Sequence, residues 1–142
     1  MRAAVVTAFD AAPRYQKFPT PVPAGEHEML VDVIAAGLHQ RVRSQADGSH
    51  YTRHDELPLV PGIDGVGRGT DGVLRYFVLP DTTVGSMAEQ TVIDLRRSVV
   101  LADAVDPVAV AAAKPCDVVV GGVAPASAVP GPTRRAHPRG NR

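Results

Sequence analysis

Apolar residues alternate with polar or small residues along several short stretches of the chain, and a period of two predicts β-strands. The clearest stretch is residues 28–36, where one face carries the apolar residues Met29, Val31, Val33 and Ala35. Further strands are expected at residues 2–8, 63–66, 73–79, 91–93 and 99–101. Short strands at such close intervals, separated by Gly and Pro, predict a mostly β fold of the barrel or sandwich type.

Turn and cap residues divide these strands and place two short helices. Four prolines between residues 13 and 23 indicate an extended connector, because prolines so closely spaced fit neither a helix nor a central strand. Residues 39–46 are expected to form one or two helical turns that end at Asp47-Gly48, and Asp71-Gly72 predicts a hairpin turn. Asp106 as N-cap and Pro107 in the first turn open an alanine-rich helix.

The pattern changes near residue 113, so the chain divides into a folded domain over residues 1–113 and a tail over residues 114–142. The domain holds 10 Lys and Arg against 14 Asp and Glu, whereas the tail holds 5 against 1 and is rich in proline. Such a tail is expected to be basic and disordered, because it cannot bury enough apolar surface to offset its chain entropy.

A frameshift near residue 113 is a second interpretation of the tail. When residues 116–123 and 135–142 are read one base later with free codon choice, they give a helix-like string and then a strand with a glycine turn. The second string, a strand followed by a glycine turn, is typical of the start of a Rossmann unit. A natural basic tail remains the alternative.

Composition excludes several classes of protein. Zero formal net charge gives no reason to expect a nucleic-acid or membrane partner. The single cysteine, Cys116, excludes an internal disulfide and a multi-cysteine zinc site. No apolar run approaches the length that crosses a bilayer, and the N-terminus lacks a signal-peptide pattern. A cytoplasmic protein is therefore expected.

Four peptides, in order and at their spacing, resemble the medium-chain dehydrogenase/reductase superfamily: Ala35-Ala36-Gly37, Pro61-Gly62-Ile63-Asp64-Gly65, residues 85–89 and residues 101–106. The resemblance is to the N-terminal, alcohol dehydrogenase-like domain of the zinc-independent, quinone oxidoreductase-like branch. It implies a GroES-like, partly open β-barrel over residues 1–113 that forms one wall of an active-site cleft. The Rossmann domain that forms the other wall in this superfamily is expected to be missing from the chain.

The resemblance also allows a test for zinc by residue type. Zinc-dependent relatives place a cysteine where His39 stands here, and a Gly-His-Glu where this chain has Gly62-Ile63-Asp64. Isoleucine does not ligate metals, and His39 with Asp64 would be one ligand too few for a catalytic zinc. No metal site is therefore predicted.

Three residues are candidates for the cleft: His39, Tyr51 and Asp64. By the resemblance, His39 faces the nicotinamide and would donate a hydrogen bond to the acceptor oxygen or to the cofactor; the alternative is a capping or surface histidine. Tyr51 could donate to a substrate carbonyl, or it could be an exposed loop residue. Asp64 between glycines favours fixing a turn over transferring protons.

The predicted function is that of an N-terminal fragment of an NAD(P)H-dependent quinone or enone reductase. The resemblance implies NADP as cofactor and a small carbonyl or quinone as substrate, and the chain alone is expected to be inactive because the pyrophosphate site is missing. One alternative is a stand-alone β-barrel binding or regulatory module, which could pair with a separate Rossmann chain. Another is an interaction protein that uses its basic tail.

Overall fold

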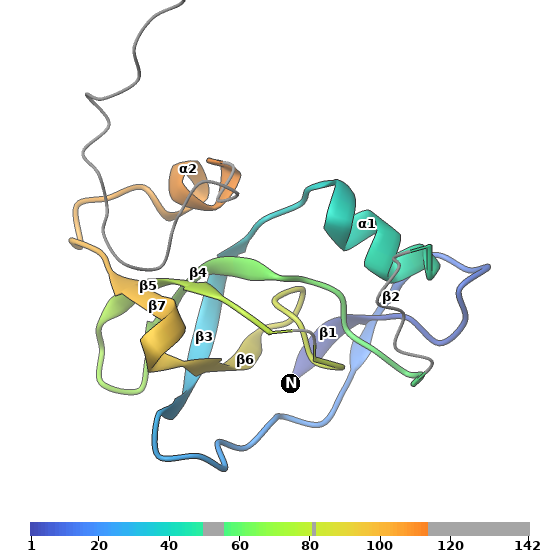
Figure 1. The fold of residues 1–142 in the computed structure, drawn as a ribbon, viewed down its shortest axis with the longest axis horizontal. Helices are drawn as coiled ribbons and strands as arrows, with labels where there is room; N and C mark the ends of the chain where they lie inside the picture. Colours follow the sequence, from blue (N-terminus) through green and yellow to red (C-terminus); the bar gives the residue numbers. More distant parts are fainter. Residues whose placement is uncertain (50–55, 81, 114–142) are drawn as a thin grey trace, which may run out of the picture.

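The computed structural model describes residues 1–49, 56–80 and 82–113 (Figure 1). Its strands are β1 (Arg2–Val5), β2 (Arg14–Lys17), β3 (Glu28–Ala36), β4 (Asp64–Gly69), β5 (Leu74–Val78), β6 (Gln90–Asp94) and β7 (Ser98–Val100). Its helices are α1 (Gln40–Asp47), the 3₁₀ turn η1 (Leu95–Arg97) and α2 (Pro107–Ala112). The predicted mostly β fold is confirmed. The predictions for the tail, the basic disordered segment and the frameshift, lie outside the described residues.

The strands form two antiparallel sheets. The larger sheet has the order β6-β3-β4-β5-β7, and the smaller one pairs β1 with β2. Residues 87–89 join the sheets, because the Ala4 N–H donates to the Met87 carbonyl at 2.8 Å and the Val33 N–H donates to the Glu89 carbonyl at 2.8 Å. The strands of the described residues therefore curl toward a barrel without closing it.

Strand β3 has the predicted limits. Its face with Met29, Val31 and Val33 contributes to the centre of the core. Val31, Phe77 and Ile93 are at most 1% exposed and pack together, with Leu79 beside them. These side chains come from β3, from β5 and the residue after it, and from β6, so strands distant in sequence share one apolar cluster. Burial of this shared cluster holds the larger sheet together.

The prediction that residues 10–25 form only a connector is wrong for β2. Arg14 to Lys17 pair with β1, in a register that places Arg2 opposite Lys17. All four residues of β2 are exposed. The flanking prolines leave these four backbone N–H groups intact, so a short edge strand forms between them.

The two predicted helices are confirmed, together with their boundary residues. Gly48 ends α1 with φ of 74°, a left-handed conformation that glycine adopts readily. The Asp106 carboxylate accepts a hydrogen bond from the Val108 N–H at 3.0 Å and so caps α2. Along the described parts of the chain, neither helix has the length and apolar character needed to cross a bilayer.

The glycines of β4 allow its backbone to lie close to β3. A Cβ at Gly65 would lie 2.6 Å from the Ala35 carbonyl oxygen, and one at Gly67 would lie 2.7 Å from the Asp32 carbonyl oxygen. Phe77 occupies the space next to both glycines. These glycines therefore serve strand packing and are not a phosphate-binding turn.

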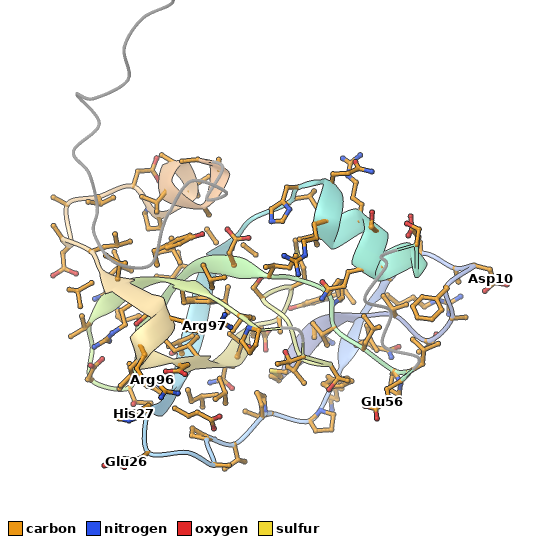
Figure 2. All side chains as sticks on the ribbon, viewed as in Figure 1. Asp10, Glu26, His27, Glu56, Arg96 and Arg97 are labelled. Carbon is orange, nitrogen blue, oxygen red and sulfur yellow. The ribbon has the colours of Figure 1, made fainter. Side chains whose placement is uncertain are left out.

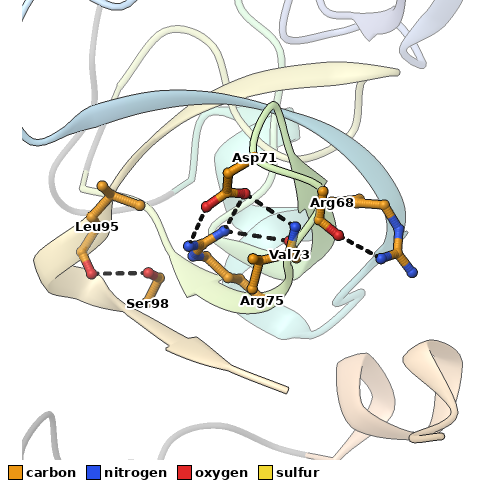
Figure 3. A network of polar contacts seen from close by, with 7 residues as sticks. Arg68, Asp71, Val73, Arg75, Leu95 and Ser98 are labelled. Carbon is orange, nitrogen blue, oxygen red and sulfur yellow. Dashed lines mark hydrogen bonds and ion pairs between the residues drawn. The ribbon is translucent and has the colours of Figure 1, made fainter. Parts of the chain in front are cut away.

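The β4–β5 hairpin is held by a compact set of polar contacts (Figure 3). Two nitrogens of the Arg75 guanidinium donate to the two oxygens of Asp71, at 2.8 and 2.6 Å. The Val73 N–H also donates to Asp71, at 3.1 Å, and Arg68 donates to the Gly72 carbonyl at 2.7 Å. Gly72 has φ of 79°, so the predicted Asp71-Gly72 turn is confirmed.

Candidate functional site

A hollow of about 430 Å³ lies between the end of β3, the start of α1 and the helix α2. Figure 1 shows the two helices on the same side of the larger sheet, one on each side of the end of β3. The lining is mostly apolar and consists of Ala35, Ala36, Leu38, His39, Gln40, Val108, Ala111 and Ala112. An apolar hollow with few polar groups is the usual form of a small-molecule site.

His39 borders the hollow because β3 ends directly before it. The Gly37 N–H donates to the Asp64 carbonyl at 3.2 Å, which fixes the exit of the chain from β3. His39 is the N-cap residue of α1, with an extended backbone at φ −122° and ψ 176°, but its side chain makes no cap hydrogen bond. The imidazole is therefore free to contact groups outside its own helix.

The structure brings two of the predicted site residues into contact. His39 Nε2 lies 3.0 Å from Asp64 Oδ1, and the exposed fractions of their side chains are 26% and 1%. The carboxylate fits there because residue 37 is glycine: a Cβ at Gly37 would lie 2.7 and 2.8 Å from the two carboxylate oxygens. A buried, oriented carboxylate thus supports a half-buried imidazole at the edge of the hollow.

Tyr76 is a third member of this group, which the sequence pattern did not indicate. Its hydroxyl donates to Asp64 Oδ2 at 3.2 Å, and the residue is 6% exposed. The β4–β5 register places Tyr76 opposite Val66, diagonal to Asp64 on the same face. The predicted turn at Asp71-Gly72 indicates this pairing only to within one residue, and a slip of one residue would place Tyr76 on the opposite face, so the turn alone did not identify Tyr76.

The chemistry of this group follows from its atoms. A carboxylate only accepts hydrogen bonds, so Asp64 accepts one from the Tyr76 hydroxyl and accepts a second from His39 when Nε2 of the imidazole carries the proton. An imidazole whose tautomer is fixed by a carboxylate partner is a common arrangement in sites that transfer protons or orient ligands.

The remaining predictions for the site have different outcomes. Tyr51 lies outside the described residues. No three His, Cys, Asp or Glu side chains come together as a possible metal site in the described ranges. Beyond the pairing with His39 and Tyr76, the backbone carbonyl of Asp64 holds Gly37, so this residue also ties β4 to the end of β3.

A second set of charged residues lies away from the hollow, at the opposite end of the larger sheet (Figure 2). His27 lies beside Arg96 at the end of the larger sheet away from the two helices (Figure 2). The Arg96 guanidinium holds the pKa of the neighbouring Asp94 carboxyl at about 2. Neither charged group borders the hollow.

Glu89 has a structural role, because its carboxylate connects segments that are distant in sequence. Its carboxylate accepts the Arg2 N–H at 2.8 Å and the Tyr15 hydroxyl at 3.0 Å. The hydrogen bond from the Arg2 backbone, followed by that from Tyr15, lowers the pKa of Glu89, and the bond to Glu89 raises the pKa of Tyr15. This carboxylate thus joins β1 and β2 to the segment before β6.

Comparisons with known proteins agree with this architecture. No family model matches the chain. A relative in Emericella nidulans, described as a probable NADPH-dependent quinone reductase, is 33% identical over 96 residues. The match covers 66% of this chain but only 27% of the relative.

Solved structures extend the likeness to the fold. The quinone oxidoreductase of Thermus thermophilus has a TM-score of 0.65 at 25% identity, over 75% of this chain and 34% of that protein. An alcohol dehydrogenase superfamily protein of Novosphingobium aromaticivorans has a TM-score of 0.66 at 22% identity, over 75% of this chain and 36% of that one. The predicted resemblance to quinone oxidoreductase-like medium-chain dehydrogenase/reductases is confirmed, and the chain spans about a third of the length of these structures.

Proposed function

We propose that residues 1–113 are the substrate-side domain of a zinc-independent, NADP(H)-dependent reductase that acts on a quinone, an enone or a similar carbonyl acceptor. The observation that carries the proposal is the His39–Asp64 pair, 3.0 Å apart, at the edge of an apolar hollow of about 430 Å³. The likeness to a probable NADPH-dependent quinone reductase and to a quinone oxidoreductase structure supports the choice of cofactor and acceptor.

The residues of the hollow fit the nicotinamide end of such a cofactor. A flat, weakly polar ring suits a lining of small apolar side chains, with Leu38 and the His39 imidazole at its border. When bound, the cofactor supplies the hydride, while the protein orients it against the acceptor. Tyr51, which follows α1 in the sequence, remains a proposed donor to the acceptor oxygen.

The phosphates of the cofactor find no comparable fit in the described residues. Phosphate-binding turns present free backbone N–H groups at a helix N-terminus, after a strand. The densest glycines here, Gly65 and Gly67, are instead packed against β3 within a strand. We therefore propose that residues 1–113 do not turn over by themselves, and that a nucleotide-binding domain must complete the site.

The test begins with the coding DNA beyond codon 113. We expect another reading phase to encode a strand, a glycine turn and a helix. A chain that includes this segment should oxidise NADPH when a quinone or an enone is added. Replacing His39 with Gln should lower kcat/KM at least tenfold, whereas His27→Gln, at the other end of the sheet, should leave it unchanged. Equal activities of the two variants, or tight NADPH capture and turnover by residues 1–142 alone, would refute the proposal.

A second candidate keeps the same hollow but obtains its other wall from a separately encoded chain. Two exposed apolar side chains at its border favour this candidate, Leu38 at 66% and Val108 at 64% exposed. A nucleotide-binding partner could cover them. If so, residues 1–142 should form a soluble heterodimer with such a partner, and Leu38→Ser with Val108→Ser should weaken it at least tenfold. A monomer that gains no NADPH oxidation from any added nucleotide-binding chain would exclude this candidate.

A further inference from the structure

Tyr76, Asp64 and His39 form a continuous line of hydrogen bonds from the interior of the domain to the hollow. Tyr76 packs with Val66, Leu74 and Ala111 in an apolar cluster. Its hydroxyl reaches Asp64 at 3.2 Å, and Asp64 reaches His39 Nε2 at 3.0 Å. Tyr76 and Asp64 are buried, whereas the His39 side chain at the hollow is 26% exposed.

The buried position of Asp64 determines where the proton of His39 lies. A carboxylate that is 1% exposed has no access to water and depends on protein donors for its hydrogen bonds. Nε2 of His39 can serve as such a donor only when it carries the proton. The other ring nitrogen, Nδ1, makes no hydrogen bond within the part of the chain that the structure describes.

The geometry points to Tyr76 and Asp64 as positioning residues that keep the His39 proton on Nε2, so that Nδ1 of the neutral ring accepts a hydrogen bond from an N–H donor, such as a primary carboxamide. This inference rests on the proposed function, since the nicotinamide of the cofactor carries such a group. It also reverses the expected polarity, because a neutral His39 that already donates to Asp64 has no proton left for an acceptor oxygen.

Tyr76 acts in this line through Asp64 and not on any ligand. Its hydroxyl occupies Oδ2, which leaves Oδ1 for the imidazole. Without that hydroxyl, one buried carboxylate oxygen loses its donor and the carboxylate can rotate toward other groups. Loss of the Tyr76 hydroxyl is therefore expected to let the Nε2 proton of His39 exchange faster with water, while the domain stays folded.

The first experiment observes the proton directly by ¹⁵N-resolved NMR of residues 1–142, with His39→Gln to assign the signal. We expect a His39 Nε2–H resonance that exchanges slowly with water. Tyr76→Phe should speed its exchange about fivefold, and Asp64→Asn at least tenfold. Two matched controls should change nothing: Tyr15→Phe removes a hydroxyl from Glu89, and Asp32→Asn alters an exposed carboxylate bound by Gln90.

Three outcomes would overturn the assignment of the proton. These are a proton on Nδ1, equal effects of Tyr76→Phe and Tyr15→Phe, and a spectrum without dispersed signals, since the buried line would not exist in such a chain. None of them requires the cofactor, so they leave the proposed reductase function to its own assay.

The second experiment tests the ligand class with two small probes at equal concentration. Nicotinamide carries a carboxamide N–H, whereas 3-acetylpyridine has the same ring and carbonyl without that donor. We expect nicotinamide to shift the Nδ1 resonance at least threefold more than 3-acetylpyridine does, and His39→Gln to abolish the difference. Equal shifts, or no shift with nicotinamide, would overturn the N–H donor assignment, even if the proton proves to lie on Nε2.

Discussion

Two carboxylates at opposite ends of the β4–β5 hairpin, Asp71 in the turn and Asp64 at the start of β4, have opposite surroundings. Asp71, in the hairpin turn, has a side chain that is 35% exposed and is bound at both oxygens by the permanently charged Arg75. Asp64, at the other end of β4, is 1% exposed and is bound by a hydroxyl and an imidazole. The better-shielded carboxylate therefore lacks a permanent cation.

This difference distinguishes a stabilising arrangement from one suited to function. The Asp71–Arg75 ion pair closes the hairpin turn, and both carboxylate oxygens already have a donor. A buried carboxylate is costly unless its partners are in place, so the group around Asp64 is a poor choice for stability alone. Four predictions test this contrast, from the largest expected effect to the smallest.

Gly37→Ala should disturb the site most. Its Cβ would lie 2.7 Å from an Asp64 oxygen, and a shift of this buried carboxylate would disturb its contacts with His39 and Tyr76. We expect the free energy of unfolding to fall by about 2 to 3 kcal/mol, as measured by urea denaturation. A loss below about 0.5 kcal/mol would mean that the carboxylate is mobile.

Asp64→Ala should come next. It leaves the Tyr76 hydroxyl buried without an acceptor, and His39 Nε2 without its partner. The expected loss is about 2 kcal/mol in the same denaturation experiment. In the double variant Asp64→Ala with Tyr76→Phe, the loss should be smaller than the sum of the two single losses, because the two residues share one hydrogen bond. Strict additivity would show that the hydroxyl and the carboxylate are not coupled.

Gly72→Ala probes the hairpin by comparison. Here φ is 79°, but a Cβ would meet no atom within 4 Å. Only backbone strain opposes the change, so the expected loss is about 1 kcal/mol. Gly72→Asn should lose less, since asparagine tolerates this conformation better. An effect as large as that of Gly37→Ala would abolish the distinction between crowding and strain.

Acid should produce the smallest change, and it should act on the hairpin. The Arg75 guanidinium, with the Val73 N–H, lowers the pKa of Asp71 from its usual 3.8 to about 2. The unfolded chain then binds more protons between these values, so this stabilisation is complete above about pH 4 and is lost as the pH falls through about 2. An NMR titration of Asp71 should show a midpoint near 2, and Arg75→Gln should raise it toward 3.8.

Much of the fold could be predicted, because local signals fixed its elements. The alternation over residues 28–36 gave β3 its limits, and Asp47-Gly48, Asp71-Gly72 and Asp106 marked the ends or starts of elements that the structure contains. Strand β2 was missed because its residues are exposed and form no apolar face. Pairing with β1, and not burial, makes that segment a strand.

The site was only partly predictable for a different reason. His39 and Asp64 stand 25 positions apart, and their contact depends on where β3 ends relative to β4. Tyr76 reads as an ordinary apolar strand residue, since its ring packs in the core and only its hydroxyl reaches Asp64. Such a mixed role becomes visible only when strand register is known.

The packing of α2 on Tyr76 gives that helix an influence beyond its short length. Ala111 lies against the tyrosine, while Val108 of the same helix borders the hollow. One side of α2 therefore lines the hollow while Ala111 packs on the ring whose hydroxyl donates to Asp64. A molecule that binds in the hollow and shifts α2 would thus also change the packing around Tyr76, and with it the donor that orients the carboxylate partner of His39.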